Sequence, residues 1–325
     1  MIKKAGYFLL GIVLLVSTIA TGDYGLSKQN IEIYKKALSL QEDMKHLFSD
    51  YQLSDYPVSF FDGNHDYVVT GDGTNYEVKK REPVLPTFVG TAYPVEDHYE
   101  IIVPTIEKFS EMFDLLGSAE KVSQLSSGGD ISFDEASYGD KEQVATIWHE
   151  GFHAYQMSHF EDNIIQCLQG RSFGENGFGE QMIVDCVDNN DKIVAYYEQE
   201  MALLKKMVLS DNVDEIKANI VQYKKLDEQR KSLLPEDILL LEEYYERVEG
   251  TAFYVESSAY ARLESNEKYM AHYIDPMDIF SNGSHKYYSM GMAKCRILDK
   301  LSPDWKNGYT FAESLTDLLY QYGEK

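Results

Sequence analysis

The sequence is poor in the basic residues that nucleic-acid-binding proteins need. Of its 325 residues, only 30 are Lys or Arg, whereas 54 are Asp or Glu, which gives a formal net charge of −24. Because DNA and RNA are bound largely by neutralising phosphates with Lys and Arg, this balance argues against a nucleic-acid partner. The acidity itself is typical of a surface that keeps a protein soluble.

Cysteine is also scarce, and this excludes several kinds of site. The chain has only Cys167, Cys186 and Cys295, and none of them belongs to a CxxC pair. A disulfide-rich scaffold and a cysteine-based zinc or redox site are therefore excluded. Cys167 and Cys186 are placed to close a small loop, whereas Cys295 lies in a helical pattern and fits a buried small apolar residue.

The amino-terminal residues have the pattern of an export signal. Lys3 and Lys4 precede an apolar run from Ala5 to Ala20, which small residues follow. The run is slightly short for a lasting membrane span of ~20 residues. We therefore expect residues 1 to 22 to be a signal peptide or an N-terminal anchor. The rest of the chain is then extracytoplasmic, either secreted or held on the outer face of the cell membrane, and we expect it to be a monomer.

The remaining residues, 23 to 325, predict one α+β domain. Residues 55 to 104 contain the strand-like segments DYVVT, YEVKK, TFVGTAY and HYEIIV, with a hairpin turn at residues 71 to 73. Residues 26 to 48 and 105 to 325 are mainly helical in pattern. Asn212 with Glu215, and Thr310 with Glu313, fit capping boxes at helix starts. The sequence thus predicts a small antiparallel sheet followed by a mainly helical body.

The segment TIWHEGFHAYQMSH contains the HExxH pattern of zinc hydrolases. His149 and His153 are four residues apart, so on a helix both project to the same side and can bind one ion. Glu150 lies beside them, where it can accept a proton from a water activated by zinc. The apolar stripe of Val144, Trp148, Phe152 and Tyr155 supports the helix that this geometry needs.

Two residues compete for the role of third zinc ligand. His159 stands where the metzincin pattern HExxHxxGxxH has its third histidine, but Gln156 replaces the glycine that turns the chain back to the metal. If the helix continues, His159 lies ~9 Å beyond His153 and points ~120° away from it. The other candidate is Glu249, on a second predicted helix. The helix glycines Gly151 and Gly250 predict that these two helices pack closely at the metal.

Three motifs together resemble a known enzyme family. EGTAFYVE, residues 249 to 256, resembles the NEGxAxYxE segment of zinc aminopeptidases of the membrane alanyl-aminopeptidase type, and HEGFH resembles their first motif. This arrangement defines the gluzincins, the wider zincin group that includes thermolysin. Tyr288 with Gly291 resembles the tyrosine and glycine of the family's YxKG segment.

The resemblance implies a role for each matching residue. His149, His153 and Glu249 would bind Zn²⁺, Glu150 would be the general base, and Tyr288 would stabilise the oxyanion. Tyr287 and His285 remain alternative oxyanion donors, because they lie beside Tyr288 in the sequence. Glu256 would support the site or face the substrate.

The chain departs from the family at several points. Val248 replaces an asparagine and Met290 a lysine, residues 154 to 248 replace a short connection, and no GxMEN motif precedes HExxH. The resemblance therefore supports zinc hydrolysis more strongly than aminopeptidase specificity. We expect an exported zinc metallopeptidase acting on a peptide or protein. The alternatives are a metzincin-like peptidase that uses His159 and a non-catalytic metal-binding or substrate-binding protein.

Overall fold

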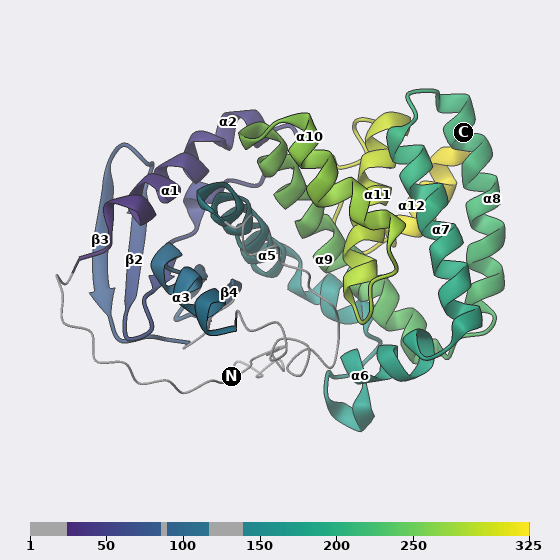
Figure 1. The fold of residues 1–325 in the computed structure, drawn as a ribbon, viewed down its shortest axis with the longest axis horizontal. Coiled ribbons are helices and arrows are strands. Elements are labelled where there is room, and N and C mark those ends of the chain that lie inside the picture. The colour runs from purple at the N-terminus through teal and green to yellow at the C-terminus, as the bar shows by residue number, and fades with distance from the viewer. Residues whose placement is uncertain (1–24, 86–89, 117–138, 325) are drawn as a thin grey trace. The chain divides into compact units, whose positions relative to one another are not determined.

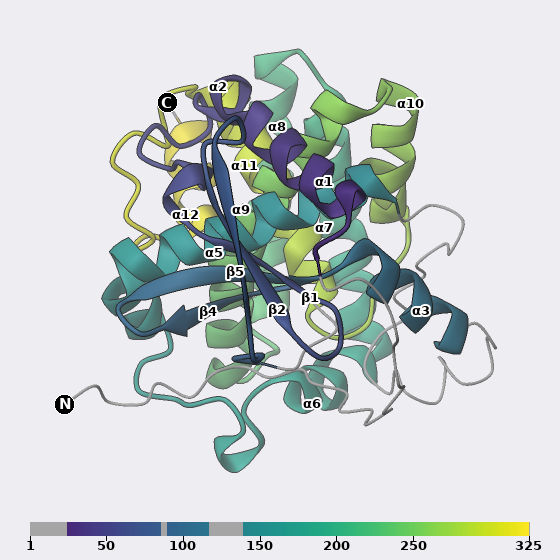
Figure 2. The same cartoon turned by 90° about the vertical axis from the view of Figure 1, so that its left-hand side faces the viewer.

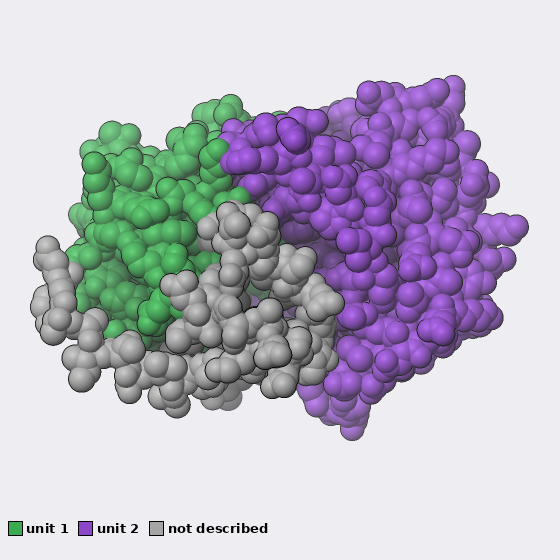
Figure 3. Space-filling model, in the orientation of Figure 1, with its two compact units in different colours: residues 1–122, 133–158 green, residues 123–132, 159–325 purple. Residues whose placement is uncertain are grey.

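A computed structural model describes residues 25–85, 90–116 and 139–324, and these fall into two units (Figures 1 and 3). Unit 1 contains the described residues before 117 and residues 139 to 158, and unit 2 contains residues 159 to 324. The predicted export signal, residues 1 to 22, lies outside the described residues. Within those residues no helix is both long and apolar enough to cross a membrane.

Unit 1 is built on a five-stranded sheet with the order β3-β2-β1-β5-β4. Figure 2 labels β1, β2, β4 and β5 of this sheet. Its strands are β1 (Val58–Phe61), β2 (Asp66–Gly71), β3 (Tyr76–Arg81), β4 (Thr91–Val95) and β5 (His98–Pro104). The hairpin predicted at residues 71 to 73 joins β2 and β3, which pair antiparallel. The sequence analysis missed β1, and β1 pairs with β5 in parallel, so the sheet is mixed rather than antiparallel. The predicted α+β class is confirmed.

The centre of this sheet is the most apolar part of unit 1. All four residues of β1 are buried, and so are the last five of β5. A strand with neighbours on both sides and side chains buried on both faces needs mainly apolar residues, which the segments VSFF and IIV supply, with Ser59 as the one polar side chain among them. The two edge strands, β3 and β4, are more exposed.

The helices of unit 1 include the one that carries HExxH. They are α1 (Lys28–Ser39), α2 (Gln41–Met44), the 3-10 turn η1 (Leu53–Asp55), α3 (Ile106–Leu116) and the first part of α5 (Asp140–Cys167). The predicted stripe of α5 is buried, and Trp148 and Phe152 each contact the Tyr51 ring at a centroid distance of 5.4 Å. A Cβ atom on Gly151 would lie 2.5 Å from the Tyr51 hydroxyl and 3.0 Å from Ile101 of β5. Gly151 therefore allows α5 to approach the sheet closely.

Unit 2 is almost entirely helical. After the last turns of α5 it contains η2 (Glu175–Gly177), α6 (Glu180–Ile183), η3 (Val184–Asp188), α7 (Asp191–Leu209), α8 (Val213–Lys231), α9 (Glu236–Leu263), α10 (Asn266–Tyr269), η4 (Met270–Ile274), η5 (Asp275–Asp278), α11 (His285–Leu301) and α12 (Leu315–Gly323). Asn212 caps α8 as predicted, by accepting hydrogen bonds from the next turn, but Glu215 does not complete the box, because it accepts from the Ser210 hydroxyl while the Asn212 backbone donates to that hydroxyl. The prediction for Thr310 was wrong, because Ser314 caps α12 instead.

Two helices of unit 2 cross with their backbones in contact. A Cβ atom on Gly250 of α9 would lie 2.6 Å from the Cα atom of Gly291 of α11, so neither position accepts a side chain. The predicted reason for Gly151 and Gly250, close packing of their two helices at the metal, was therefore wrong. Each glycine allows a close approach within its own unit: Gly151 to Tyr51 and the sheet, Gly250 to α11.

Buried charges lie beside this crossing. Arg230 of α8 donates hydrogen bonds to Glu200 (2.9 Å), Asp227 (3.0 Å) and Glu242 (2.6 Å), and every one of these side chains is at least 97% buried. We call these four residues the Arg230 cluster.

The three cysteines of this unit are free thiols, so the loop closure between Cys167 and Cys186 does not form, whereas Cys295 is buried as expected.

Candidate metal centre

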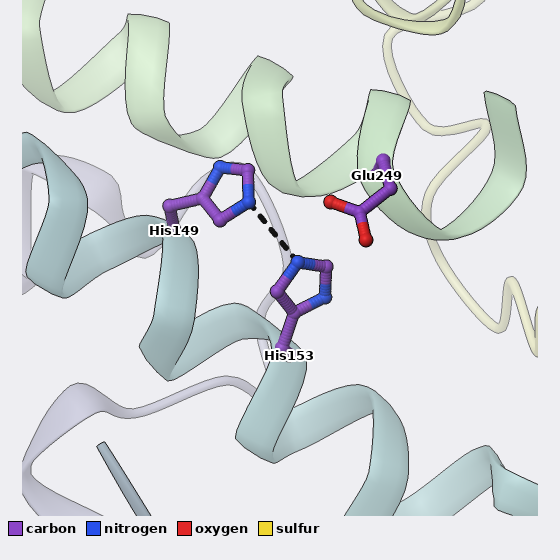
Figure 4. A group of neighbouring side chains, drawn as sticks. All are labelled: His149, His153 and Glu249. Carbon is purple, nitrogen blue, oxygen red and sulfur yellow. Dashed lines mark hydrogen bonds between the residues drawn. The ribbon is translucent and has the colours of Figure 1, made fainter. Parts of the chain in front are cut away.

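The two histidines of HExxH face one another from successive turns of α5. Their Nε2 atoms are 3.0 Å apart, and their rings are 4.7 Å apart between centroids at an angle of 78° (Figure 4). The helical spacing of four residues produces this arrangement, and the buried neighbours Trp148 and Phe152 pack the adjacent face of the helix into the core. Both nitrogens are therefore directed at one small region, as ligands of a single ion would be.

A residue of the same helix holds the second nitrogen of His153. The Nδ1 atom of His153 lies 2.7 Å from the side-chain oxygen of Gln156, which is completely buried. The sequence analysis used Gln156 only to argue against a turn at that position. Residues three apart on a helix are neighbours, so the spacing of His153 and Gln156 could have predicted this contact from the sequence.

Glu150 lies against the chain just before the edge strand β4. A Cβ atom on Gly90 would stand 2.7 Å from Oε1 of Glu150, and Glu150 as a whole is buried. Only glycine allows the carboxylate to come this close to the backbone at that point. The predicted general base thus lies where β4 begins, beside the histidine pair on α5.

Glu249, the predicted third ligand, lies in the middle of α9. It is half-buried and close enough to Tyr244 that burial, together with the charge of Glu249, raises the pKa of that tyrosine. Among the described residues, His149, His153 and Glu249 are the side chains of His, Cys, Asp or Glu that qualify as a set of three potential ligands for one ion (Figure 4).

The three candidate oxyanion donors occupy different surroundings at the start of α11. Tyr287 is completely buried, and its hydroxyl lies 3.1 Å from that of Tyr197 beside the Arg230 cluster. Tyr288 is half-buried, and its ring lies 6.4 Å from the rings of both Tyr245 and Phe253. His285 is exposed, with its ring 4.9 Å from that of Tyr288.

The neighbours of Tyr288 relate it to the predicted ligand. Tyr245 and Phe253 are the residues four before and four after Glu249 on α9, so all three lie along one face of that helix. Tyr288 thus lies over the face of α9 that carries Glu249, whereas Tyr287 is held in the core. Glu256, further along α9, accepts a hydrogen bond of 2.8 Å from the Tyr273 hydroxyl.

His159 lies near the end of the regular part of α5. The helix continues through Gln156, and its backbone departs from helical geometry only at Phe160, after His159. The chain therefore makes no turn between His153 and His159 that would direct both toward one ion, and His159 does not belong to the candidate set of ligands.

The chain matches no known family model, no curated protein and no solved structure.

Proposed function

We propose that this protein is a zinc-dependent peptidase in which His149, His153 and Glu249 bind the metal. The observation that carries the proposal is the pair of facing histidine nitrogens, 3.0 Å apart, with Glu150 on the intervening turn. Two nitrogens bound to one tetrahedral zinc at 2.0–2.1 Å are about 3.3 Å apart. The histidine pair therefore already has nearly the separation that zinc requires, and two imidazoles with one carboxylate are a common set of zinc ligands.

Each remaining residue has a defined task in the proposed reaction. Bound zinc would supply Lewis-acid activation of the attacking water and of the substrate carbonyl. Glu150 accepts a proton from that water and passes it to the departing amine. The Tyr288 hydroxyl donates a hydrogen bond to the substrate oxygen that gains negative charge. Tyr288 is preferred over Tyr287, because Tyr287 is held in the core by its contact with Tyr197.

The edge strand beside Glu150 supports a peptide as the substrate. Among the described strands β4 pairs only with β5, so its outer edge can pair with an extended chain. Gly90, against which the Glu150 carboxylate lies, immediately precedes this strand. A peptide added along β4 would therefore pass the general base. The proposal includes action outside the cytoplasm as a monomer, with residues 1 to 22 as the export signal.

The test compares the unmutated protein with Glu150→Gln on a peptide library read by mass spectrometry. We expect zinc-dependent cleavage that a chelator stops and added zinc restores. Glu150→Gln should lower the rate by about 10²–10⁴-fold, because the proton acceptor is lost, while the zinc content stays the same. His159→Ala is the matched control and should cleave normally.

Two results would contradict the peptidase. Cleavage that is equally fast in Glu150→Gln would remove the general base from the mechanism. Zinc bound at one ion per chain without cleavage of any library peptide would favour the alternative of a non-catalytic metal-binding protein.

A further inference from the structure

The side chain of Gln156 is buried where an apolar residue would otherwise be expected. It has no exposed surface and lies on α5 one turn after His153. Burial of an amide is costly unless its polar atoms are hydrogen-bonded, so the position calls for a specific partner. Its oxygen has one, the Nδ1 atom of His153 at 2.7 Å.

This contact determines which nitrogen of His153 carries the proton. An amide oxygen only accepts hydrogen bonds, so the Nδ1 atom beside it has to be the donor. In the neutral ring the lone pair is then on Nε2. That nitrogen is the one directed at Nε2 of His149, 3.0 Å away. The hydrogen bond thus leaves the nitrogen next to His149 available to bind a metal.

Gln156 also preserves the helix that the arrangement requires. A glycine at this position would favour the turn that brings a histidine at position 159 back to the metal in the metzincin pattern. With glutamine the helix continues past Gln156, and the departure from helical geometry comes only at Phe160. One residue thereby orients His153 and keeps His159 away from it.

We propose that Gln156 is a positioning residue for metal binding, which holds His153 in the tautomer and orientation that present Nε2 to the ion. The inference rests on the proposed zinc site. Outer-shell hydrogen bonds to a ligating histidine typically contribute 10–100-fold in metal affinity. The contribution comes from fixing the ring in advance, because metal binding then requires no change of tautomer.

The main test measures zinc affinity by competition with a chelator in Gln156→Met and Gln156→Glu. Methionine has a similar length and no hydrogen-bond acceptor for Nδ1, so we expect zinc affinity to fall by about 10–100-fold. Glutamate keeps the acceptor and should restore most of the affinity. Gln143→Met is the matched control, because Gln143 is equally buried on α5 but donates to the Pro104 carbonyl at 2.8 Å. It should leave zinc affinity unchanged.

A spectroscopic measurement tests the inference without metal. Nitrogen-15 NMR of the zinc-free protein, with His153 assigned by the loss of its signals in His153→Asn, shows which ring nitrogen carries the proton. We expect the proton on Nδ1 in the unmutated protein, and a shift toward the other tautomer in Gln156→Met.

The outcomes separate this inference from the proposed function. Zinc binding as tight in Gln156→Met as in Gln143→Met, or a proton found on Nε2 of His153, would overturn the role of Gln156 and leave the zinc site standing. If Gln156→Met does not fold, the unmutated protein's NMR spectrum and Gln156→Glu still decide. Absence of zinc binding in the unmutated protein would overturn the proposed function, while the NMR result would still decide the tautomer.

Discussion

The Arg230 cluster in unit 2 and the histidine pair in unit 1 are both buried groups of polar side chains, but they are organised in opposite ways. In the Arg230 cluster a cation lies at the centre, and three carboxylates surround it within 3.0 Å. In the histidine pair two nitrogens face one another at 3.0 Å with a carboxylate on the adjacent turn. The first group contains its own counter-charge, whereas the second brings together two imidazole nitrogens, each of which can donate or accept depending on the tautomer.

Under the proposed function, this difference separates residues that stabilise the fold from residues that bind the metal. A buried charge costs free energy unless an opposite charge and hydrogen bonds compensate for it. Arg230 provides that compensation for Glu200, Asp227 and Glu242, so the cluster is complete without a ligand. For the histidine pair, we propose that a metal completes the group. Changing one group should therefore affect stability, and changing the other should affect metal binding.

The largest effect is expected from His149→Ala. The variant loses one of two imidazole ligands, and total affinities of 10–16 kcal/mol at four-ligand structural zinc sites imply a loss of about 10²–10³-fold per ligand. Mass spectrometry of the purified protein should find less than one zinc per chain. The thermal unfolding temperature of the zinc-free protein should change little. Unchanged zinc content would contradict the proposal that the histidine pair, unlike the Arg230 cluster, binds a metal.

The reciprocal change is Arg230→Met. It leaves Glu200 and Glu242 without the cation that contacts them, whereas Asp227 keeps its ion pair with Lys231 at 3.1 Å, so the free energy of unfolding in urea should fall by about 3–5 kcal/mol. Zinc content should remain unchanged in the folded protein. Arg171→Met is the control, because its ion pair with Asp237 is partly exposed and should contribute less than about 1 kcal/mol. Equal losses in the two variants would contradict a special role for the cluster.

A smaller effect depends on pH and involves Glu200. Burial raises the pKa of Glu200 from 4.5 to about 7, in spite of the neighbouring Arg230. The folded protein therefore holds this proton over a range in which the unfolded chain releases it, and stability falls as the pH rises from 4.5 to about 7. The loss amounts to at most about 3 kcal/mol.

Glu200→Gln should remove this contribution, because glutamine does not titrate. The difference in unfolding free energy between Glu200→Gln and the unmutated protein should grow in favour of the variant up to about pH 7 and then level off. Glu198→Gln, an exposed position on the same helix, is the control. A difference that does not vary with pH would show that Glu200 does not titrate in this range.

The smallest effect is expected from His159→Ala. Its position beyond the continuous part of α5 predicts no change in zinc content and a stability change within about 0.5 kcal/mol. Loss of zinc in this variant would favour the metzincin alternative over Glu249.

The parts of the fold that depend on local patterns were predictable from the sequence. The buried stripe of α5 repeats at helical spacing, and Asn212 caps α8 through its own side chain. Strand β1 was missed because a buried run of only four residues does not distinguish strand from helix, and its parallel partner β5 is distant in the sequence. At α12 the choice between Thr310 and Ser314 as the cap could not be made from residue types alone, because both are accepted caps.

The site was predictable to the extent that it follows from spacing along one helix. The interval between His149 and His153 predicts their facing nitrogens, and the continuous helix explains the position of His159. The contact of Glu150 with Gly90 and that of Gly250 with Gly291 depend on how distant segments pack. The sequence does not select the oxyanion donor among His285, Tyr287 and Tyr288, because all three lie within four residues of one another. Preferring one of them depends on the surroundings of each side chain.

The most direct test of the zinc site is the metal content of the unmutated protein, Glu249→Ala and His159→Ala after zinc is supplied and the excess removed. The account predicts about one zinc per chain in the unmutated protein and in His159→Ala, and loss of zinc in Glu249→Ala. No zinc in the unmutated protein, or zinc retained in Glu249→Ala and lost in His159→Ala, would contradict it.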